Sequence, residues 1–209
     1  MSIDSHEELR TVYREATGAP LDKVIGELDQ HCIGFLAKSP FMVLSTADAN
    51  GVVDGSPKGG VPGFARVLDD GSVAWADSAG NNRLDSFENI VRNPSVALLF
   101  MIPGLGETLR INGTAQLLTN PELCSSFTLG SKPAKVVVRV AVEEAYVHCA
   151  LAFRRSSLWE PDTWLDDTDR PNGVAMLKDH ASIPDSTEAV EKIYEAALDE
   201  GIWEPGGQA

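Results

Sequence analysis

Cationic and hydroxyl side chains stand where this chain turns, which favours binding of an anion the size of a phosphate. Lys58 lies in the segment SPKGG, directly after a predicted strand. Glycines there let a ligand approach the backbone, and the lysine supplies a mobile cation. Asn82 and Arg83 stand where GNN leads into a predicted helix, and a helix N-terminus beside an arginine attracts anions. A surface lysine in a loop and a simple helix cap are the alternatives.

A second group of polar residues lies farther along the chain. Arg110 falls in the middle of a predicted strand and shares one face with Thr108, because strand side chains alternate with a period of two. Such an arginine either points inward and is paired, or faces a ligand. Arg154 and Arg155 precede Trp159 in RRSSLW. One of the two arginines is a candidate ligand contact, and the alternative is a pair of cations at a helix C-terminus.

The sequence identifies no catalytic residue and no metal site. Its three cysteines are far apart and form no CxxC pair, so neither a disulfide framework nor a cysteine-based zinc site is expected. The four histidines show no HExxH or paired spacing. His148 is a candidate proton donor, with an ordinary core or surface histidine as the alternative.

These candidate residues are carried by short strands around one helix. The hairpin signal Asn-Gly at 50–51 separates two predicted strands, 41–46 and 52–56. Further strands are predicted at 64–68, 73–77, 95–102 and 107–118, and the segments 136–142 and 146–149 supply further strand. The continuous apolar run at 95–102 predicts a strand buried on both faces. Six or seven short antiparallel strands with one central helix at 82–92 indicate a mainly β (α+β) fold, a closed or split barrel.

Helices are predicted at both ends of the barrel. Ser5 and Glu8 form a capping box for a first helix, and further helices are predicted at 21–30 and 31–37. Residues 159–184 are predicted to form a long surface loop, followed by a C-terminal helix at 186–200. We therefore expect one domain in three parts: a helical extension packed on the barrel (1–38), the barrel (39–160) and an acidic loop and helix (161–209).

Composition limits the partners that this protein is expected to have. The 209 residues carry a net charge of −14, and residues 160–209 alone hold 3 basic and 13 acidic residues. Nucleic-acid binding is disfavoured, because it needs clustered lysine and arginine. No apolar run approaches the roughly 20 residues of a membrane span, and the polar N-terminus does not resemble a secretory signal. A cytoplasmic location is expected.

The order of these parts resembles the pyridoxamine 5'-phosphate oxidase-like flavoproteins, the FMN-binding split barrels. Three segments carry the resemblance: MVLSTADANGVVDGSPKGG, NNRLDSFENIVRNPSVALLF and GETLRINGTAQLL. It covers roughly residues 35–160. The segment HCALAFRRSSLW is further similar to an uncharacterised subgroup of the family.

This resemblance implies a homodimer that binds FMN at the subunit interface. The FMN phosphate is expected against Ser56, Lys58, Asn82 and Arg83. The strand beside the flavin ring is expected to include Trp75, Ala76 and Asp77. Thr108 matches a glutamine with which the founding oxidase contacts the cofactor, and Arg110 shares its face. Arg154 or Arg155, together with Trp159, is expected from the partner subunit.

The chain also departs from the founding oxidase. GSPKGG replaces the basic strand motif, the linker into the central helix is longer, and the segment that holds pyridoxal phosphate substrates has no counterpart. We therefore do not expect pyridoxamine phosphate oxidation. The expected function is an FMN-dependent oxidoreductase of unassigned substrate. The alternatives are a flavin-binding or storage protein without turnover, or a split barrel that uses haem, with His148 or His31 as axial ligand, or a deazaflavin coenzyme.

Overall fold

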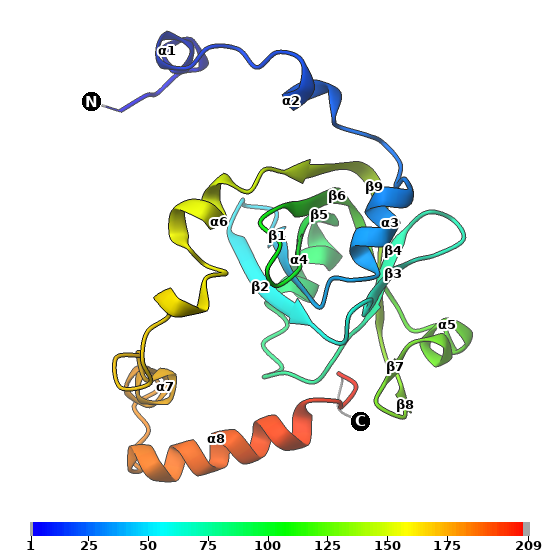
Figure 1. Cartoon of the computed structure of the whole chain (residues 1–209). Coiled ribbons are helices and arrows are strands. Elements are labelled where there is room, and N and C mark those ends of the chain that lie inside the picture. Colours follow the sequence, from blue (N-terminus) through cyan, green and yellow to red (C-terminus); the bar gives the residue numbers. More distant parts are fainter. Residues whose placement is uncertain (1, 207–209) are drawn as a thin grey trace.

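A single antiparallel sheet of seven strands, curled into a split barrel, forms the body of the protein (Figure 1). The computed structural model describes residues 2–206. The strand order is β2-β1-β5-β6-β9-β4-β3. The strands are β1 (Phe41–Ala47), β2 (Val53–Gly59), β3 (Ala65–Val67), β4 (Val73–Ala76), β5 (Ser95–Met101), β6 (Thr108–Leu118) and β9 (Val137–His148). The predicted split barrel is confirmed.

The interior of the barrel is filled by alternate residues of the strands. Met42 and Leu44 of β1, together with Leu98 and Phe100 of β5, are fully buried. Trp75 of β4 packs in the same cluster. Because alternate side chains point to opposite faces of a strand, every second residue is left for the outer surface or for a site at the rim.

Strand β5 differs from its prediction. Val96, Leu98 and Phe100 are buried, but Leu99 and Met101, on the opposite face of the strand, are only half-buried. The strand has one face in the barrel core and one apolar face on the outside of the barrel. An apolar run alone does not show which neighbour covers its second face, and no described part of this chain buries that face fully.

The longest pair of strands, β6 and β9, contains a bulge at Gly113. The two predicted strands at 136–142 and 146–149 are one continuous strand, β9, and the register with β6 shifts between Asn112 and Gly113. A Cβ atom at Gly113 would lie 2.0 Å from the carbonyl oxygen of Ala141. Only glycine therefore allows the two backbones to approach so closely at this bulge.

Strand β2 extends farther than predicted, through Pro57 to Gly59. Proline donates no backbone hydrogen bond and is tolerated on an edge strand. β2 is such a strand, because its one neighbour in the sheet is β1. The extension places Lys58 within a strand, although the sequence predicted that the residue lies just beyond one.

The central helix α4 (Asp85–Arg92) packs against β1, β6 and β2. It begins three residues later than predicted, because Asn82 and Leu84 have positive φ angles of 56° and 59° and cannot continue a right-handed helix. Asn89 is buried and donates a hydrogen bond of 3.0 Å to Thr46 of β1. This bond fixes the helix to the barrel wall.

The N-terminal segment holds three short helices: α1 (His6–Val12), α2 (Ala19–Asp22) and α3 (Gln30–Leu36). Ser5 caps α1 as predicted. The predicted helix at 21–30 is absent, because the backbone of Ile25 pairs with Ala145 of β9 instead. α1 and α2 bury no residue, whereas α3 packs against β3.

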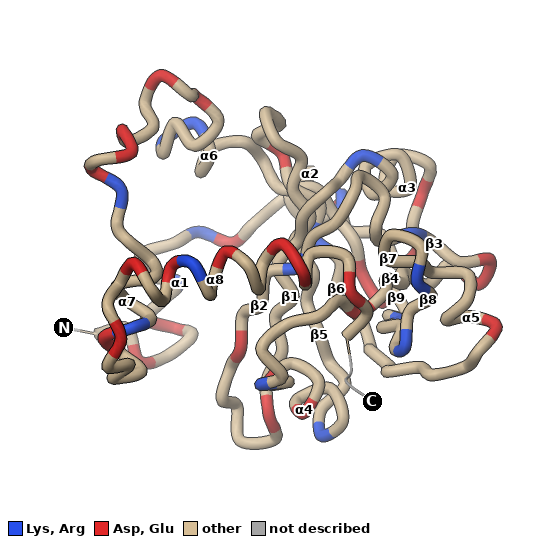
Figure 2. The backbone as a smooth tube through the Cα atoms, turned by 90° about the horizontal axis from the view of Figure 1, so that it is seen from below, with Lys and Arg blue, Asp and Glu red and all other residues tan. Residues whose placement is uncertain are grey.

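The C-terminal segment leaves the barrel after β9 and returns to it at its end. Its elements include α6 (Leu151–Ser156), the 3₁₀ turn η1 (Pro161–Thr163), α7 (Gly173–His180) and α8 (Thr187–Gly201). The predicted surface loop thus contains a helix, α7. Acidic positions recur along α8 (Figure 2). Between β6 and β9 lie α5 (Pro121–Ser126) and the small hairpin of β7 (Thr128–Leu129) and β8 (Lys132–Pro133). No helix within residues 2–206 is both long and apolar enough to cross a membrane.

Candidate cofactor site

One face of β2 presents three polar side chains toward the rim of the barrel. Asp54, Ser56 and Lys58 are half-buried, and the residues between them are exposed. Ser86, a buried residue of α4, donates a hydrogen bond to the carboxylate of Asp54. The edge strand and the central helix are therefore joined beside this polar face.

Lys58 is a half-buried cation, and the one hydrogen bond that its side chain makes within the described residues is to a hydroxyl group. Its Nζ donates to Ser56 Oγ at 2.7 Å. No carboxylate in the described part of the chain lies within ion-pair distance of it. Burial lowers the pKa of Lys58, while the charges of Asp77 and Asp54 act to raise it. A partly desolvated ammonium group without a paired anion fits a site for a phosphate.

Asp77, at the end of β4, faces the same space. Burial raises the pKa of its carboxyl group, and the charge of Lys58 acts to lower it. The two groups influence each other without forming an ion pair, so both retain capacity to interact with a ligand.

The loop between β4 and α4 forms another wall of the site. Asn82 and Leu84 take left-handed conformations within it. The Arg83 backbone donates to Asn81 Oδ1 at 3.1 Å, and the Arg83 guanidinium pairs with Asp85 at 2.8 Å. The Arg83 side chain is 73% exposed, so most of its donors are available to a ligand.

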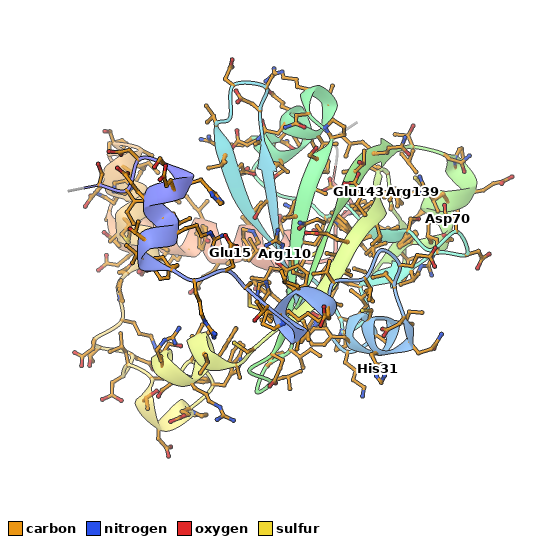
Figure 3. The ribbon with its side chains drawn as sticks, turned by 90° about the horizontal axis from the view of Figure 1, so that it is seen from above. Glu15, His31, Asp70, Arg110, Arg139 and Glu143 are labelled. Atoms are coloured by element: carbon orange, nitrogen blue, oxygen red, sulfur yellow. The ribbon has the colours of Figure 1, made fainter. Side chains whose placement is uncertain are left out.

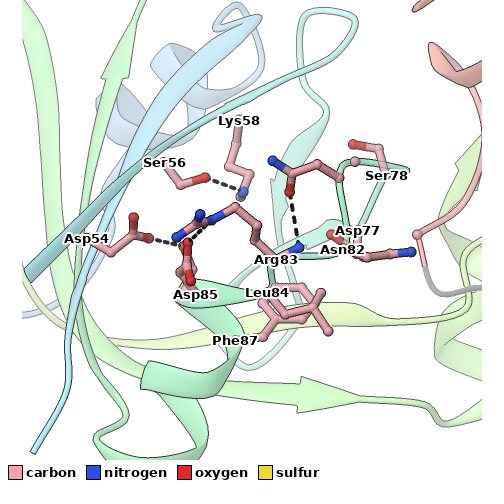
Figure 4. A pocket seen from close by; sticks show the side chains of 14 residues that line it. Asp54, Ser56, Lys58, Asp77, Ser78, Asn82, Arg83, Leu84, Asp85 and Phe87 are labelled. Carbon is pink, nitrogen blue, oxygen red and sulfur yellow. Dashed lines mark hydrogen bonds and ion pairs between the residues drawn. The ribbon is translucent and has the colours of Figure 1, made fainter. Parts of the chain in front are cut away.

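Together these residues enclose a cavity of about 290 Å³ (Figure 4). Hydroxyl, amide and charged side chains dominate its labelled lining. The lining residues are Asp54, Ser56, Lys58, Asp77, Ser78, Gly80, Asn81, Asn82, Arg83, Leu84, Asp85, Ser86, Phe87 and Gly206. We call this cavity the Lys58 pocket.

Five of the candidate residues named from the sequence therefore line one cavity: Ser56, Lys58, Asp77, Asn82 and Arg83. The other six lie elsewhere. Trp75 is 2% exposed and belongs to the barrel core. Thr108 is buried at the start of β6.

Arg110 lies on the outer face of the sheet (Figure 3). Its guanidinium group donates to Asn112 at 3.0 Å, lies 3.7 Å from Glu144 and stands 5.3 Å from the centre of the Tyr146 ring. His148 stacks near the same ring, at 5.0 Å between centroids. Burial, together with the charges of Lys23 and Arg110, lowers the pKa of His148.

Arg154 and Arg155 are exposed on α6, and Trp159 follows that helix. The Trp159 indole donates to the carbonyl oxygen of Leu105 at 2.9 Å and stacks on Phe153 at 5.5 Å. These contacts hold α6 against the turn between β5 and β6.

Sequence reasoning missed several residues of the pocket. Asp54 shares a period of two with Ser56 and Lys58, so the strand pattern could have identified it. Ser86 and Gly206 gave no such signal, because only the packing of α4 and the return of the C-terminus bring them to the cavity. Within residues 2–206, no group of three His, Cys, Asp or Glu side chains could hold a metal ion.

Residues 28–149, more than half of the chain, match the family described as pyridoxamine 5'-phosphate oxidase. The chain belongs to this family. The match spans every strand of the barrel and the whole Lys58 pocket except Gly206, and it confirms the resemblance read from the sequence. The family consists of flavin-binding split barrels. A search of curated proteins returned no match.

Solved structures of similar proteins cover the barrel region. HupZ from Group A Streptococcus is 20% identical, covering 56% of this chain and 91% of its own, with a TM-score of 0.46. A pyridoxamine 5'-phosphate oxidase-related, FMN-binding protein of Nostoc punctiforme is 12% identical, covering 56% and 78%, with a TM-score of 0.42. An F420 reductase is 15% identical, covering 58% and 98%, with a TM-score of 0.41.

Proposed function

We propose that this protein binds FMN, with the phosphate in the Lys58 pocket, and acts as an FMN-dependent oxidoreductase. One observation carries the proposal: Lys58 is a half-buried cation in a polar cavity, and among residues 2–206 its direct partner is a hydroxyl group and no carboxylate. A phosphate would supply the missing anion, and membership of a flavin-binding family favours FMN as its source.

The pocket offers two kinds of hydrogen-bond donor to a phosphate. Lys58 and Arg83 would supply cationic donors, and Ser56 and Asn82 would supply neutral ones. The left-handed turn at Asn82 shapes the loop that the phosphate would approach. FMN supplies the hydride chemistry when bound, while the protein anchors and orients it and tunes it by hydrogen bonds.

The size of the pocket supports a site completed by a second subunit. A volume of about 290 Å³ is at the lower end of the roughly 300–1,000 Å³ typical of ligand sites. The pocket therefore suits the polar end of FMN and leaves the ring system outside it. We propose that a homodimer covers the ring, as the resemblance implied.

The outer face of the sheet is the surface that we assign to this dimer. Val43, Leu99, Arg110 and Tyr146 are cross-strand partners in one row over β1, β5, β6 and β9. This row is half apolar and only partly buried. In this arrangement Arg110 contacts the flavin bound by the partner subunit, as do Arg154, Arg155 and Trp159. Thr108 and Trp75 act by packing behind the site.

We also propose a cytoplasmic location. All three cysteines, Cys32, Cys124 and Cys149, are free thiols. Unpaired cysteines are typical of a reducing compartment.

The first test is the visible absorption spectrum of the purified protein, with the released chromophore identified by mass. Two bands in the blue and near-ultraviolet, with FMN as the released species, would support the proposal. A colourless protein that also fails to take up added FMN would refute it. If the protein binds FMN but oxidises neither NADH nor NADPH, the result would favour a flavin-storage protein over an enzyme. A Soret band in the spectrum would favour haem as the cofactor.

The phosphate assignment is tested by Arg83→Ala. We expect FMN to bind about tenfold more weakly, a loss of about 1.4 kcal/mol, because one charged donor is removed at an exposed position. Binding of riboflavin, which lacks the phosphate, should not change. Flavin fluorescence titration measures both affinities.

Arg92→Ala is the matched control for Arg83→Ala. Arg92 is also an exposed arginine of the α4 region paired with a carboxylate, Glu88, but it does not line the Lys58 pocket. An affinity for FMN that stays within about threefold in Arg83→Ala, a change below 1 kcal/mol, would show that the phosphate does not bind here.

A further inference from the structure

Residues 204–206 lie against the loop between β4 and α4, which forms one wall of the Lys58 pocket. The carbonyl oxygen of Glu204 accepts a hydrogen bond of 2.7 Å from the Ala79 N–H, and the Gly206 N–H donates one of 3.0 Å to the carbonyl oxygen of Asp77. Ser78 and Pro205 thereby form an antiparallel bridge. Residues 204–206 thus add a short strand to the pocket wall, and Gly206 lines the cavity itself.

This contact leaves no room for a side chain at position 206 unless the Asp77 carboxylate or the segment itself moves. A Cβ atom there would lie 1.8 Å from Asp77 Oδ2 and 3.0 Å from the backbone oxygen of Ser78. The terminal segment therefore touches both the backbone of the loop and the carboxylate that faces Lys58. Any shift of this segment would change the shape of the pocket at the Asp77 end.

Two further elements hold the segment in place. Helix α8 ends at Gly201, with two residues between it and the segment. The carboxylate of Glu204 forms an ion pair with Lys132 of the β7–β8 hairpin. In Figure 1 the segment that follows α8 lies below the barrel, at the end of α8 opposite to α7. The segment is thus held by α8 on one side and by the β7–β8 hairpin on the other.

We infer that residues 204–206 form a strap that closes the Lys58 pocket beyond the phosphate and restricts the ligand to a terminal phosphate monoester. This inference rests on the proposed function and names the ligand class of that site. A flavin whose phosphate carries a further group, such as FAD or a deazaflavin with an acidic tail, would meet the strap backbone. It would also meet the negative charge of Asp77.

The strap is tested by the relative affinity for FMN and FAD. Gly206→Ala forces the segment and the Asp77 carboxylate apart, and a chain that ends at Trp203 lacks the segment. We expect the wild-type protein to prefer FMN by about tenfold or more, and both variants to lose most of that preference through tighter binding of FAD. Flavin fluorescence titration gives both affinities.

Gly201→Ala is the matched control. A Cβ atom at Gly201, five residues before Gly206 at the end of α8, meets nothing within 4 Å. Its FMN-to-FAD ratio should equal that of the wild type. Far-ultraviolet circular dichroism and thermal unfolding establish that each variant is folded. If Gly206→Ala does not fold, the relative affinity of the truncated chain for FMN and FAD tests the strap.

Inorganic phosphate and pyrophosphate separate failure of the strap from failure of the flavin proposal. A ratio of FMN affinity to FAD affinity that is unchanged in both variants would overturn the inference about the strap and would leave the proposed flavin site in place. A wild-type protein that binds neither flavin, but prefers phosphate to pyrophosphate until the strap is removed, would overturn the flavin proposal alone. A protein that binds none of these four ligands would overturn both.

Discussion

Lys58 acquires its chemistry from the environment in which the edge strand places it. Partial burial disfavours the ammonium form and lowers its pKa from the ordinary 10.5, and the nearby carboxylates only partly offset this effect. Since Asp77 and Asp54 do not pair with it directly, the electrostatic attraction of Lys58 remains available to an incoming anion. A lysine on an open surface would be solvated and would gain less from the same contact.

This environment predicts how FMN binding depends on pH. The pKa of Lys58 lies below the ordinary 10.5. Lys58 is therefore charged at pH values below its lowered pKa and loses its proton as the pH rises through that value. FMN affinity should therefore fall across that alkaline window. In Lys58→Arg it should not fall, because the guanidinium pKa is above about 12. Isothermal titration at a series of pH values above 7 measures the effect.

Lys58→Met and riboflavin supply the controls for this pH profile. Lys58→Met should bind FMN weakly at every pH, and riboflavin binding should show no Lys58-dependent decline, since it lacks the phosphate. An alkaline decline of the same size in Lys58→Arg as in the wild type would assign the titration to a different group.

At the scale of elements, the pocket depends on the meeting of β2, the end of β4 and the loop before α4. α4 is held to β1 by Asn89 and to β2 by Ser86. β4 is held in the sheet by β9. The long β6–β9 pair is therefore the element on which one side of the pocket depends, although it contributes no residue to the lining.

Gly113→Ala tests that dependence. The added Cβ would lie 2.0 Å from the carbonyl oxygen of Ala141. We expect a loss of about 3 kcal/mol or more in the free energy of unfolding, because overpacking against backbone cannot be relieved by a side-chain rotation. Urea denaturation followed by circular dichroism measures it.

Gly55→Ala is the control for Gly113→Ala. Gly55 is also within a strand, β2, and a Cβ atom there meets nothing within 4 Å. Its free energy of unfolding should stay within about 0.5 kcal/mol of the wild type. Equal destabilisation by the two substitutions would show that the bulge does not constrain the sheet.

At the scale of the whole molecule, two surfaces with incompletely buried apolar side chains concern assembly. One is the outer row of the sheet, where Leu99 is half-buried between Val43 and Arg110. The other is the C-terminal arm, where Trp164 and Ile193 are more than half exposed. Exposed apolar patches of this kind mark interaction surfaces. The proposed homodimer would cover the first of them.

Leu99→Glu is expected to weaken that dimer. Burying a carboxylate in a partly apolar interface without a partner is costly, so the variant should elute and scatter light as a monomer where the wild type is a dimer. Val91→Glu introduces the same charge on the exposed face of α4, at a residue 77% exposed, and should leave the dimer intact. A Leu99→Glu protein with the dimer mass at micromolar concentration would place the interface elsewhere.

The sequence by itself determined the barrel, because strand identity follows from local signals. The Asn-Gly turn, the alternation in β6 and the Asn93-Pro94 stop after the central helix are each encoded within a few residues, and all agree with the structure. The sequence also identified five pocket residues, because cations and hydroxyl groups beside glycines and a helix start are a local pattern. The β5 outer face, the lost helix at 21–30 and the late start of α4 were not predictable in this way.

Tertiary structure decided what depends on contacts between distant segments. The backbone of Ile25 pairs with Ala145, 120 residues away in the chain, which overrides its local helical periodicity. Trp75 lies in the core because β4 is flanked by β3 and β9. Gly206 reaches the pocket because the chain returns through α7 and α8, and no pattern near either end encodes that meeting. Local sequence therefore specified the elements and part of the phosphate site, while long-range packing set the final wall of the pocket.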